Sequence, residues 1–560
     1  IDINMKGVPI AVPFVVYTRF HEFVASTEGS TFMHRFQPPL AWNDYTKIFF
    51  LLSSDMSFWL KSGQENLRRI LALRNNENRA KNVVFFVGDG MGISTITAGR
   101  VFKGQAKGAT GEEYKLAFED FPGTGFAKTY NVDKQVPDSA ATATAMFSGV
   151  KCRYMVLGLD ATAPYNHCDK VINLAAKVTT IADWAQQSGM DTGFVTTTRI
   201  THATPAGLYA HTNNREWECD SAIPEQYRSC VKDIARHLNA AEIVKVIMGG
   251  GARCMGLPME PTDPETCSRT DGVNLAEVWQ RNNPEGKLVT TAQQLAAVDV
   301  ANSSKILGIF ATNHLPYHAV KPDQVPSLAE MTAKAIEMLS KNDNGFFLMV
   351  ESGRIDMAHH KNYAKLALRE LSELEEAVEA TVRKLDLEET LILVTADHSH
   401  SFTMNGYPER GNDILGFANK PNEPFYETLS YANGPGFLHH RRNDTTKLNE
   451  TWRPVEKDET RGEPFYQHLA ATYLPDETHG GEDVGVYATG PYSHLIRGTF
   501  EQSYVAHVVA YAACFRHWPS HCDDSYGRYF YHVENSVGTI GIPSLWSILL
   551  VSLLAIVVRI

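Results

Sequence analysis

Short, largely apolar runs recur along the chain, and polar or acidic residues follow them closely. Unbroken apolar runs are typical of strands that are buried on both faces of a parallel sheet. The pattern predicts buried strands over 83–87, 193–197, 346–350 and 391–395, and the same sheet is expected to resume near 483–487.

Between these runs, apolar positions recur every three or four residues, which predicts helices. The spacing is clear over 327–340 and over 366–385, and a shorter helix is predicted over 179–188. The alternation of strands and helices implies an α/β fold, with a large, mostly parallel central sheet that helices cover on both faces.

The patterned region forms one large domain, which we place at 51–530. We expect residues 1–50 to lie largely outside the fold. From 405 to 472 the composition shifts toward Gly, Pro, Asn and charged residues, which predicts a loop-rich insertion within the domain. The segment 531–560 ends in an apolar tail and forms a third region.

Composition narrows the possible functions. At 560 residues, with 43% apolar and 21% charged residues, the chain can bury a large core. Its formal net charge of −12 argues against a nucleic-acid-binding protein, because nothing would neutralise the phosphates. An acidic protein can still bind phosphate groups through metal ions that it holds locally.

The segment Pro137–Ala145 places a serine directly after an acid and before a run of small residues. Pro137 ends any preceding strand, so we expect a helix to begin at Ser139. Unpaired N–H groups in the first turn of a helix favour an anionic ligand, which makes Ser139 a candidate nucleophile. Alternatively, Asp138 and Ser139 only cap the helix.

Acids and histidines stand at the ends of the predicted strands, one helical turn apart, or, for His479, shortly before a strand. They are Asp89, Glu351, Asp356, His360, Asp397, His398 and His479. Asp356 and His360 share one face of a helical turn because they are four residues apart. Each residue alone can be a cap or turn residue, but together they form a ligand set. Imidazole and carboxylate ligands suit zinc, and oxygen ligands suit magnesium.

Five segments carry a resemblance to one known family. They are Val87–Gly92, Pro137–Thr144, Glu351–Asp356, Thr395–Ser399 and Thr478–Asp483. These segments resemble the signatures of alkaline phosphatases, and the likeness is closest to the animal type that a glycosylphosphatidylinositol (GPI) lipid anchors to membranes. It extends from about residue 57 to residue 522.

The resemblance implies three metal sites and a phosphate clamp. The first zinc would be held by Asp356, His360 and His479. The second zinc would be held by Asp89, Asp397 and His398, and magnesium by Asp89, Thr204 and Glu351. Arg215 would hold two phosphate oxygens, and His202 would lie near the magnesium and the substrate.

The function that follows is hydrolysis of phosphate monoesters of broad specificity at alkaline pH, through a phosphoserine at Ser139. Sulfatases and nucleotide phosphodiesterases are the alternative enzymes, and Arg215 together with the Pro-Asp-Ser-Ala segment favours monoesters over both. A surface receptor or adhesion protein that has lost catalysis is the other alternative. The intact zinc ligands argue against it.

Two positions depart from the family pattern. Met357 stands where the family often has a polar side chain, so the resemblance does not predict the turnover rate or the pH profile of this chain. A calcium site of the animal enzymes would use carboxylates where this chain has Ala311 and Val325, although Glu265 is kept. Calcium needs six to eight oxygen ligands, so we expect two zincs, one magnesium and no tightly held calcium.

The eight cysteines form no CxxC pair, and their even number suits disulfides in an oxidising compartment. Sequons at Asn302, Asn443 and Asn449 agree with a secreted glycoprotein. The resemblance implies the disulfides Cys168–Cys230 and Cys514–Cys522. Four cysteines remain, and we pair them as Cys254–Cys267 and Cys152–Cys219. The spacing of cysteines in a sequence does not by itself determine which of them are bonded.

Residues 545–558 are apolar except for two serines, and a small polar stretch, 534–538, precedes them with a spacer between. This order is typical of a signal that is exchanged for a GPI anchor. A simple tail anchor is the alternative, although the run is short for a spanning helix. The resemblance also implies a homodimer at the cell surface, on the extracellular face of the plasma membrane.

If the tail is cleaved near Asn535 or Ser536 and replaced by lipid, phosphatidylinositol-specific phospholipase should release the enzyme from cells. The measurement is phosphatase activity in the supernatant before and after treatment. Activity that stays in the membrane fraction would favour a retained helix.

Overall fold

The computed structural model describes residues 56–240, 244–260, 267–418, 425–441 and 452–515. Its helices are α2 Met56–Ala72, α3 Ile93–Ala106, α4 Ser139–Ser148, α5 Lys170–Ala176, α6 Ile181–Gln187, α7 Ala203–Ala206, α8 Ile234–Ala240, α9 Ala252–Met255, α10 Leu275–Asn282, α11 Ala292–Ala296, α12 Leu328–Leu339, α13 Arg354–His360, α14 Ala364–Lys384, α15 Gly436–His440 and α16 Tyr504–Ala513. The predicted helices over 179–188, 327–340 and 366–385 are confirmed as α6, α12 and α14.

A ten-stranded sheet forms the centre of the domain, in the order β17-β2-β16-β8-β1-β7-β3-β4-β6-β5. Its strands are β1 Asn82–Gly88, β2 Gly123–Lys128, β3 Asp191–Arg199, β4 Val244–Gly250, β5 Lys287–Val289, β6 Ile306–Ile309, β7 Phe346–Ser352, β8 Thr390–Ala396, β16 Val484–Thr489 and β17 Arg497–Glu501. Every pairing in this sheet is parallel except those of β16 with β2 and β8. The predicted mostly parallel sheet is therefore confirmed.

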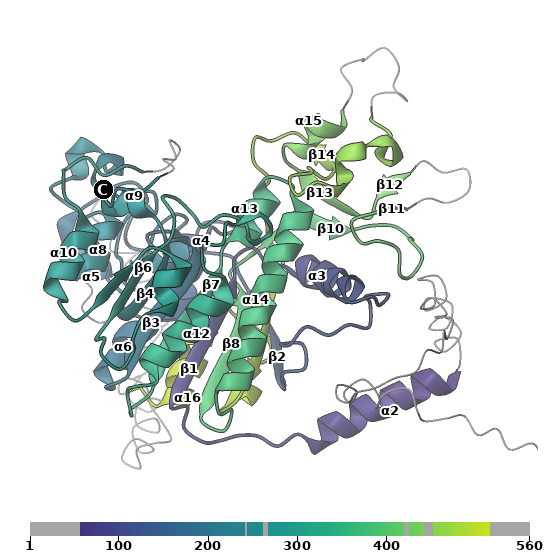
Figure 1. Cartoon of the computed structure of the whole chain (residues 1–560), viewed down its shortest axis with the longest axis horizontal. Coiled ribbons are helices and arrows are strands. Elements are labelled where there is room, and N and C mark those ends of the chain that lie inside the picture. Colours follow the sequence, from purple (N-terminus) through teal and green to yellow (C-terminus); the bar gives the residue numbers. More distant parts are fainter. Residues whose placement is uncertain (1–55, 241–243, 261–266, 419–424, 442–451, 516–560) are drawn as a thin grey trace, which may run out of the picture. The chain divides into compact units, whose positions relative to one another are not determined.

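Helices cover both faces of this sheet, as Figure 1 shows. On one face α12 packs on β3, β4 and β7, while α14 packs on β7 and β1. On the other face α6 lies against β3 and β7, and α16 against β1. Strands β1, β7 and β8 are buried along their whole length, which explains their unbroken apolar runs.

The sequence pattern missed several strands of the sheet. Strand β2 contains two glycines and alternates between buried and exposed residues, because it lies near one edge. Strand β4 contains Lys245, and β6 is only four residues long. These strands carry weak local signals and depend on their neighbours for pairing and burial.

The region predicted as a loop-rich insertion holds short elements: β11 Phe417–Ala418, β12 Tyr426–Glu427, β13 Leu429–Asn433, α15 and β14 Ala470–Thr472. Strand β13 pairs with β14 and with β10, Phe402–Met404. Phe402, Leu429 and Tyr431 join an apolar cluster with residues of α3 and α14, so the region packs on the main domain. Its bounds at 405 and 472 stay a prediction.

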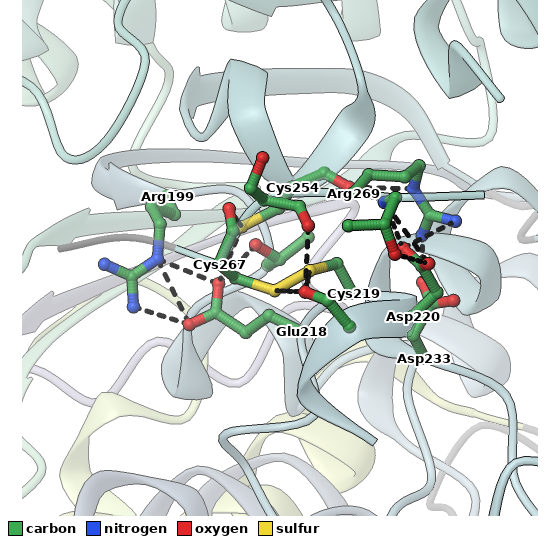
Figure 2. Close-up of a disulfide and its surroundings, with 12 residues drawn as sticks. Arg199, Glu218, Cys219, Asp220, Asp233, Cys254, Cys267 and Arg269 are labelled. Carbon is green, nitrogen blue, oxygen red and sulfur yellow. Dashed lines mark hydrogen bonds and ion pairs between the residues drawn. A yellow bond between two sulfur atoms is a disulfide. The ribbon is translucent and has the colours of Figure 1, made fainter. Parts of the chain in front are cut away.

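The structure corrects part of the cysteine pairing. Cys168–Cys230 is confirmed, but Cys219 is bonded to Cys267, with their Cα atoms 6.2 Å apart (Figure 2). The pairs Cys254–Cys267 and Cys152–Cys219 are therefore wrong, and Cys152 and Cys254 are buried free thiols.

The free thiols have other partners. Cys254 donates to a Glu218 carboxylate oxygen at 3.6 Å, and Cys152 donates to the Val156 carbonyl at 3.3 Å. Cys514 is in a disulfide, and its predicted partner Cys522 lies outside the described residues.

Several predictions about the chain ends fall on residues that the structure does not describe. These are the segment 1–50 and the anchor signal at 531–560. Among the described residues, the structure has no helix with the length and apolarity needed to cross a bilayer.

Replacing Cys219 by Ser should lower the free energy of unfolding by about 2–4 kcal/mol, because the disulfide closes a long loop in the unfolded chain. Urea denaturation of the variant and of wild type measures the difference. Cys254→Ser is the control, since it leaves both described disulfides intact. Non-reducing peptide mapping that linked Cys254 to Cys267 would contradict the pairing.

Candidate active site

The candidate site lies at the carboxyl ends of four neighbouring strands, β8, β1, β7 and β3. The register aligns Gly88 with Ala396 on one side and with Ser352 on the other. Asp89 and Asp397, the residues after Gly88 and Ala396, therefore emerge side by side, with Glu351 one strand along. Loops beyond the carboxyl ends of parallel strands are where open α/β sheets bind ligands.

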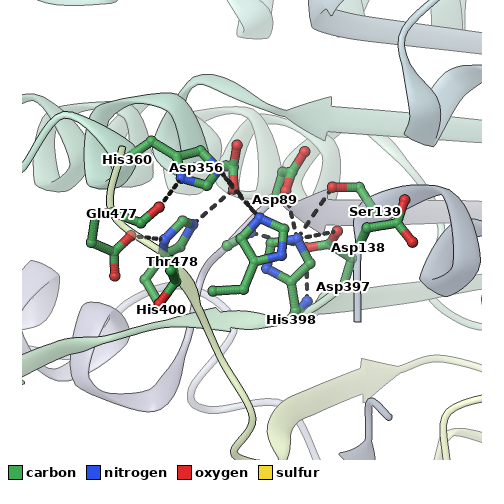
Figure 3. A network of polar contacts seen from close by, with 12 residues as sticks. Asp89, Asp138, Ser139, Asp356, His360, Asp397, His398, His400, Glu477 and Thr478 are labelled. Atoms are coloured by element: carbon green, nitrogen blue, oxygen red, sulfur yellow. Dashed lines mark hydrogen bonds and ion pairs between the residues drawn. The ribbon is translucent and has the colours of Figure 1, made fainter. Parts of the chain in front are cut away.

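Ser139 is the first residue of α4 and is buried, as is the rest of that helix. Asp138 caps the helix, since its Oδ2 accepts a hydrogen bond from the Ala140 N–H at 3.0 Å. Ser139 Oγ lies 3.2 Å from His398 Nε2 and faces the cluster of acids and histidines (Figure 3). The helix cap and the serine that faces the cluster are thus two features of one segment.

Asp356, His360 and His479 converge on one point. Asp356 Oδ1 lies 3.3 Å from His360 Nε2, one helical turn away on α13, and 3.4 Å from His479 Nε2. Strand β15, His479–Gly480, pairs with β9, Ser399–His400, and this pairing places His479 opposite His400 and close to Asp356. The Nδ1 atoms of His360 and His479 face backbone carbonyls, which leaves their Nε2 atoms directed at the carboxylate.

Asp89, Asp397 and His398 form a second group, with one ligand atom of each within 4.8 Å of the others. His398 Nε2 lies 3.1 Å from Asp397 Oδ2 and 3.6 Å from Asp89 Oδ1. Asp397 Oδ1 accepts the N–H groups of Gly90 and His398 at 2.9 and 2.8 Å, which holds the carboxylate in place. Burial lowers the pKa of His398, so its imidazole is neutral and able to bind a cation.

A third group contains Asp89, Glu351 and His202. Both oxygens of Asp89, one oxygen of Glu351 and the Thr204 hydroxyl are buried without a hydrogen-bond partner among the described residues. Buried oxygens are rarely left unpaired in folded proteins, and hard cations such as magnesium bind this kind of oxygen set. The residues present therefore fit a metal ion.

The electrostatics of the acids agree with that fit. Burial raises the pKa of Asp89 well above its usual value, and the carboxylates of Asp397 and Asp356 add to the rise. Burial likewise raises the pKa of Glu351 to about 7. Crowded buried carboxylates need a cation to stay ionised at neutral pH.

Arg215 completes the site on the side of Ser139. Its guanidinium lies 3.3 Å from Asp138 Oδ2 and 2.9 Å from His202 Nε2. Burial and the positive charge of Arg215 lower the pKa of His202. A partly buried guanidinium next to the start of a helix is suited to a dianionic ligand.

Sequence reasoning missed two residues of the site, His400 and Glu477. His400 Nε2 lies 2.8 Å from Asp356 Oδ1, and its Nδ1 faces Glu477 Oε2 (Figure 3). Burial would lower the pKa of His400, but Glu477 and Asp356 raise it to about 10, so His400 is a cation. The available signal was spacing: His400 is two residues after His398, and Glu477 two residues before His479.

Glycine is required beside this pair. Gly90 has φ +72°, and a Cβ atom there would lie 2.5 Å from the His400 ring. The backbone after β1 can therefore approach the site only without a side chain.

Comparison with known proteins identifies relatives of the chain. The alkaline phosphatase family model matches residues 80–515. The chain is 47% identical to alkaline phosphatase 4 of Drosophila melanogaster, over 84% of each chain. It is 40% identical to the membrane-bound alkaline phosphatase of Bombyx mori, over 90% of this chain and 91% of that one.

Solved structures agree on the fold. The crystal structure of Thermus thermophilus alkaline phosphatase aligns with a TM-score of 0.56 at 22% identity. The alignment covers 80% of this chain and 94% of that one.

In the metal-free protein, the raised pKa of Glu351 should make stability fall as the pH rises. The unfolded chain releases this proton near its usual pKa of 4.5, whereas the folded chain holds it to about 7. Glutamine cannot be ionised, so the variant Glu351→Gln should avoid this loss. Its free energy of unfolding should exceed that of wild type by an amount that grows from pH 4.5 upward and reaches about 3 kcal/mol at pH 7.

Urea titrations of both proteins in chelator, from pH 4.5 to 7, measure this difference. The control is Glu337→Gln, a half-exposed carboxylate on α12 that pairs with Lys334. A wild-type advantage that grows with pH would contradict the assigned crowding of carboxylates.

Proposed function

This chain belongs to the alkaline phosphatase family, and on that premise we propose how its residues hydrolyse phosphate monoesters. The family match over 80–515 and the relatives at 40–47% identity make it an alkaline phosphatase enzyme acting on small phosphomonoesters. The groups of Asp, Glu and His side chains indicate metal cofactors. The identities of the metals and the roles of individual residues are the proposal.

The proposed cofactors are two Zn²⁺ and one Mg²⁺. Asp356, His360 and His479 offer one carboxylate oxygen and two imidazole nitrogens, which is a zinc-like set. The second zinc set is Asp89, Asp397 and His398. The oxygen-rich set of Asp89, Glu351 and Thr204 suits magnesium. When bound, zinc ions lower the pKa of coordinated hydroxyl groups and water and stabilise negative charge on oxygen.

Ser139 is the proposed nucleophile, and its position carries the proposal. Its Oγ lies 3.2 Å from His398 Nε2, at the first residue of a buried helix. In the first step Oγ forms a bond to phosphorus while the bond to the alcohol oxygen breaks and the alcohol leaves. In the second step water cleaves the phosphoserine and releases inorganic phosphate.

Arg215 is proposed to hold two oxygens of the phosphoryl group. Asp138 orients the guanidinium from one side and His202 from the other. The planar Arg215 guanidinium and the N–H groups at the start of α4 can both donate to the equatorial oxygens of the phosphoryl group, where negative charge concentrates in the transition state. Phosphoryl transfer depends mainly on this positioning and charge neutralisation.

A homodimer and a GPI anchor at the cell surface belong to the same proposal. Helix α2 has no buried residue, and Trp59, Leu60 and Leu67 are more than half exposed, which favours a partner surface. The Bombyx mori relative is a membrane-bound enzyme. The disulfides agree with an extracellular location.

Ser139→Ala should abolish the phosphoenzyme and reduce hydrolysis of p-nitrophenyl phosphate at least about a thousandfold, because only the nucleophile is lost. Labelling with radioactive phosphate at acidic pH, followed by gel autoradiography, measures the intermediate. The matched control is Ser148→Ala at the other end of α4, whose hydroxyl donates to the Thr144 carbonyl. It should retain labelling. Undiminished labelling of Ser139→Ala would rule out the assigned nucleophile.

A further inference from the structure

A hollow of about 1240 Å³ adjoins the site beside His360. Its lining includes Met357, Lys361 and Asp476 near His360, the segment 310–317 after β6, and Val325. Phe310 and Val325 are buried apolar residues. The space is large enough for an organic group of substantial size next to the reacting phosphate.

Arg354, at the start of α13, is the unusual residue of this hollow. Its guanidinium carbon lies 3.8 Å from the centre of the Tyr317 ring, and Nη1 donates to Met357 Sδ at 3.0 Å. Its Nε atom is buried and has no hydrogen-bond partner among the described residues. A thioether is a weak acceptor, so this guanidinium keeps hydrogen-bonding capacity for a stronger one.

The other charged groups of the hollow differ from Arg354. Lys361 forms an ion pair with Asp476, and Arg199 with Glu218 (Figure 2). Glu260 also lines the hollow. Among the described residues no carboxylate forms an ion pair with Arg354, although it is only two residues from Asp356. Burial raises the pKa of Glu370, and the positive charge of Arg354 acts to lower it, but the two form no ion pair, so the guanidinium can still bind an anion directly.

We propose that this hollow receives the alcohol part of the substrate and that Arg354 binds a second anionic group on it, a carboxylate or a phosphate. The inference rests on the proposed function, because it assumes that the phosphate being hydrolysed lies between Ser139 and Arg215. It names a preferred substrate class: phosphomonoesters whose leaving alcohol carries its own negative charge. Met357 contributes because its sulfur is only a weak acceptor for Arg354. The anionic group of the substrate can therefore replace Met357 as the hydrogen-bond partner of the guanidinium.

Three phenyl phosphates that differ at the meta position test this preference: a neutral carboxamide, a carboxylate and a non-hydrolysable phosphonate. Wild type should show kcat/KM about tenfold higher for a charged ester than for the carboxamide, as expected for one charge-assisted hydrogen-bonding group. The two charged esters distinguish carboxylate from phosphate as the recognised group.

Arg354→Gln should remove this ratio, and Arg354→Lys should keep part of it, since lysine retains the charge but not the planar fork. Arg383→Gln is the matched control: Arg383 lies on α14, is largely exposed and pairs with Glu379. It should leave all three values unchanged. Metal content and melting temperature of each variant establish that the comparison is made on folded, loaded enzyme.

The inference would be overturned if the ratio of kcat/KM for a charged ester to that for the carboxamide ester were the same in wild type, Arg354→Lys and Arg354→Gln. It would also be overturned if wild type showed no preference for the charged esters. Loss of the ratio in Arg354→Gln, with partial retention in Arg354→Lys, would support it. If wild type hydrolysed none of the three esters, the proposed function itself would be contradicted. The two failures are therefore distinguishable.

Discussion

The burial of several carboxylates at one edge of the sheet is the constraint on which the structure depends. Asp89, Glu351, Asp356 and Asp397 are all buried, and both oxygens of Asp89 lack a hydrogen-bond partner among the described residues. Burying an unpaired charge is costly, so these groups must either take up protons or meet cations. The surrounding scaffold keeps them together despite their mutual repulsion.

The scaffold does this through elements that are themselves stable. Strands β1, β7 and β8 are hydrogen-bonded in register and fully buried, so the residues after them have little freedom. Helix α4 is buried along its length and delivers Ser139 to the same edge. Other side chains fix the orientation of these groups. His400 contacts the Asp356 carboxylate, and Glu477 in turn contacts His400. Each side chain of the candidate site is thereby held in position by the scaffold.

The two sides of the site differ in how their charges are compensated. On the side of Ser139, Arg215 contacts both Asp138 and His202, and the histidines face carboxylates or backbone carbonyls. On the side of the hollow, Arg354 is held by an aromatic ring and a thioether. The first arrangement suits chemistry common to all monoesters, and the second leaves room for selectivity toward the alcohol.

Local patterns in the sequence determined the class of fold and picked out the acids and histidines at the strand ends, while the grouping of the candidate site residues came from the family resemblance. The buried strands, the helix at Ser139 and the pair Asp356–His360 follow from apolar runs, capping and helical spacing, which act over a few residues. The acids at the strand ends could be placed because the ends of parallel strands meet at one edge.

Tertiary structure alone decided what depends on contacts between distant segments. Strand β16 runs antiparallel to β8, and β2 pairs with β16 and β17 near one edge of the sheet. Cys219 bonds to Cys267, and His400 contacts Asp356. No local pattern relates the residues that these contacts join. The same holds for Arg354, which stacks on Tyr317 and has no hydrogen-bond partner for its Nε atom among the described residues. Such pairings are selected by the packing of the whole chain, because each element offers several equivalent partners until its neighbours are in place.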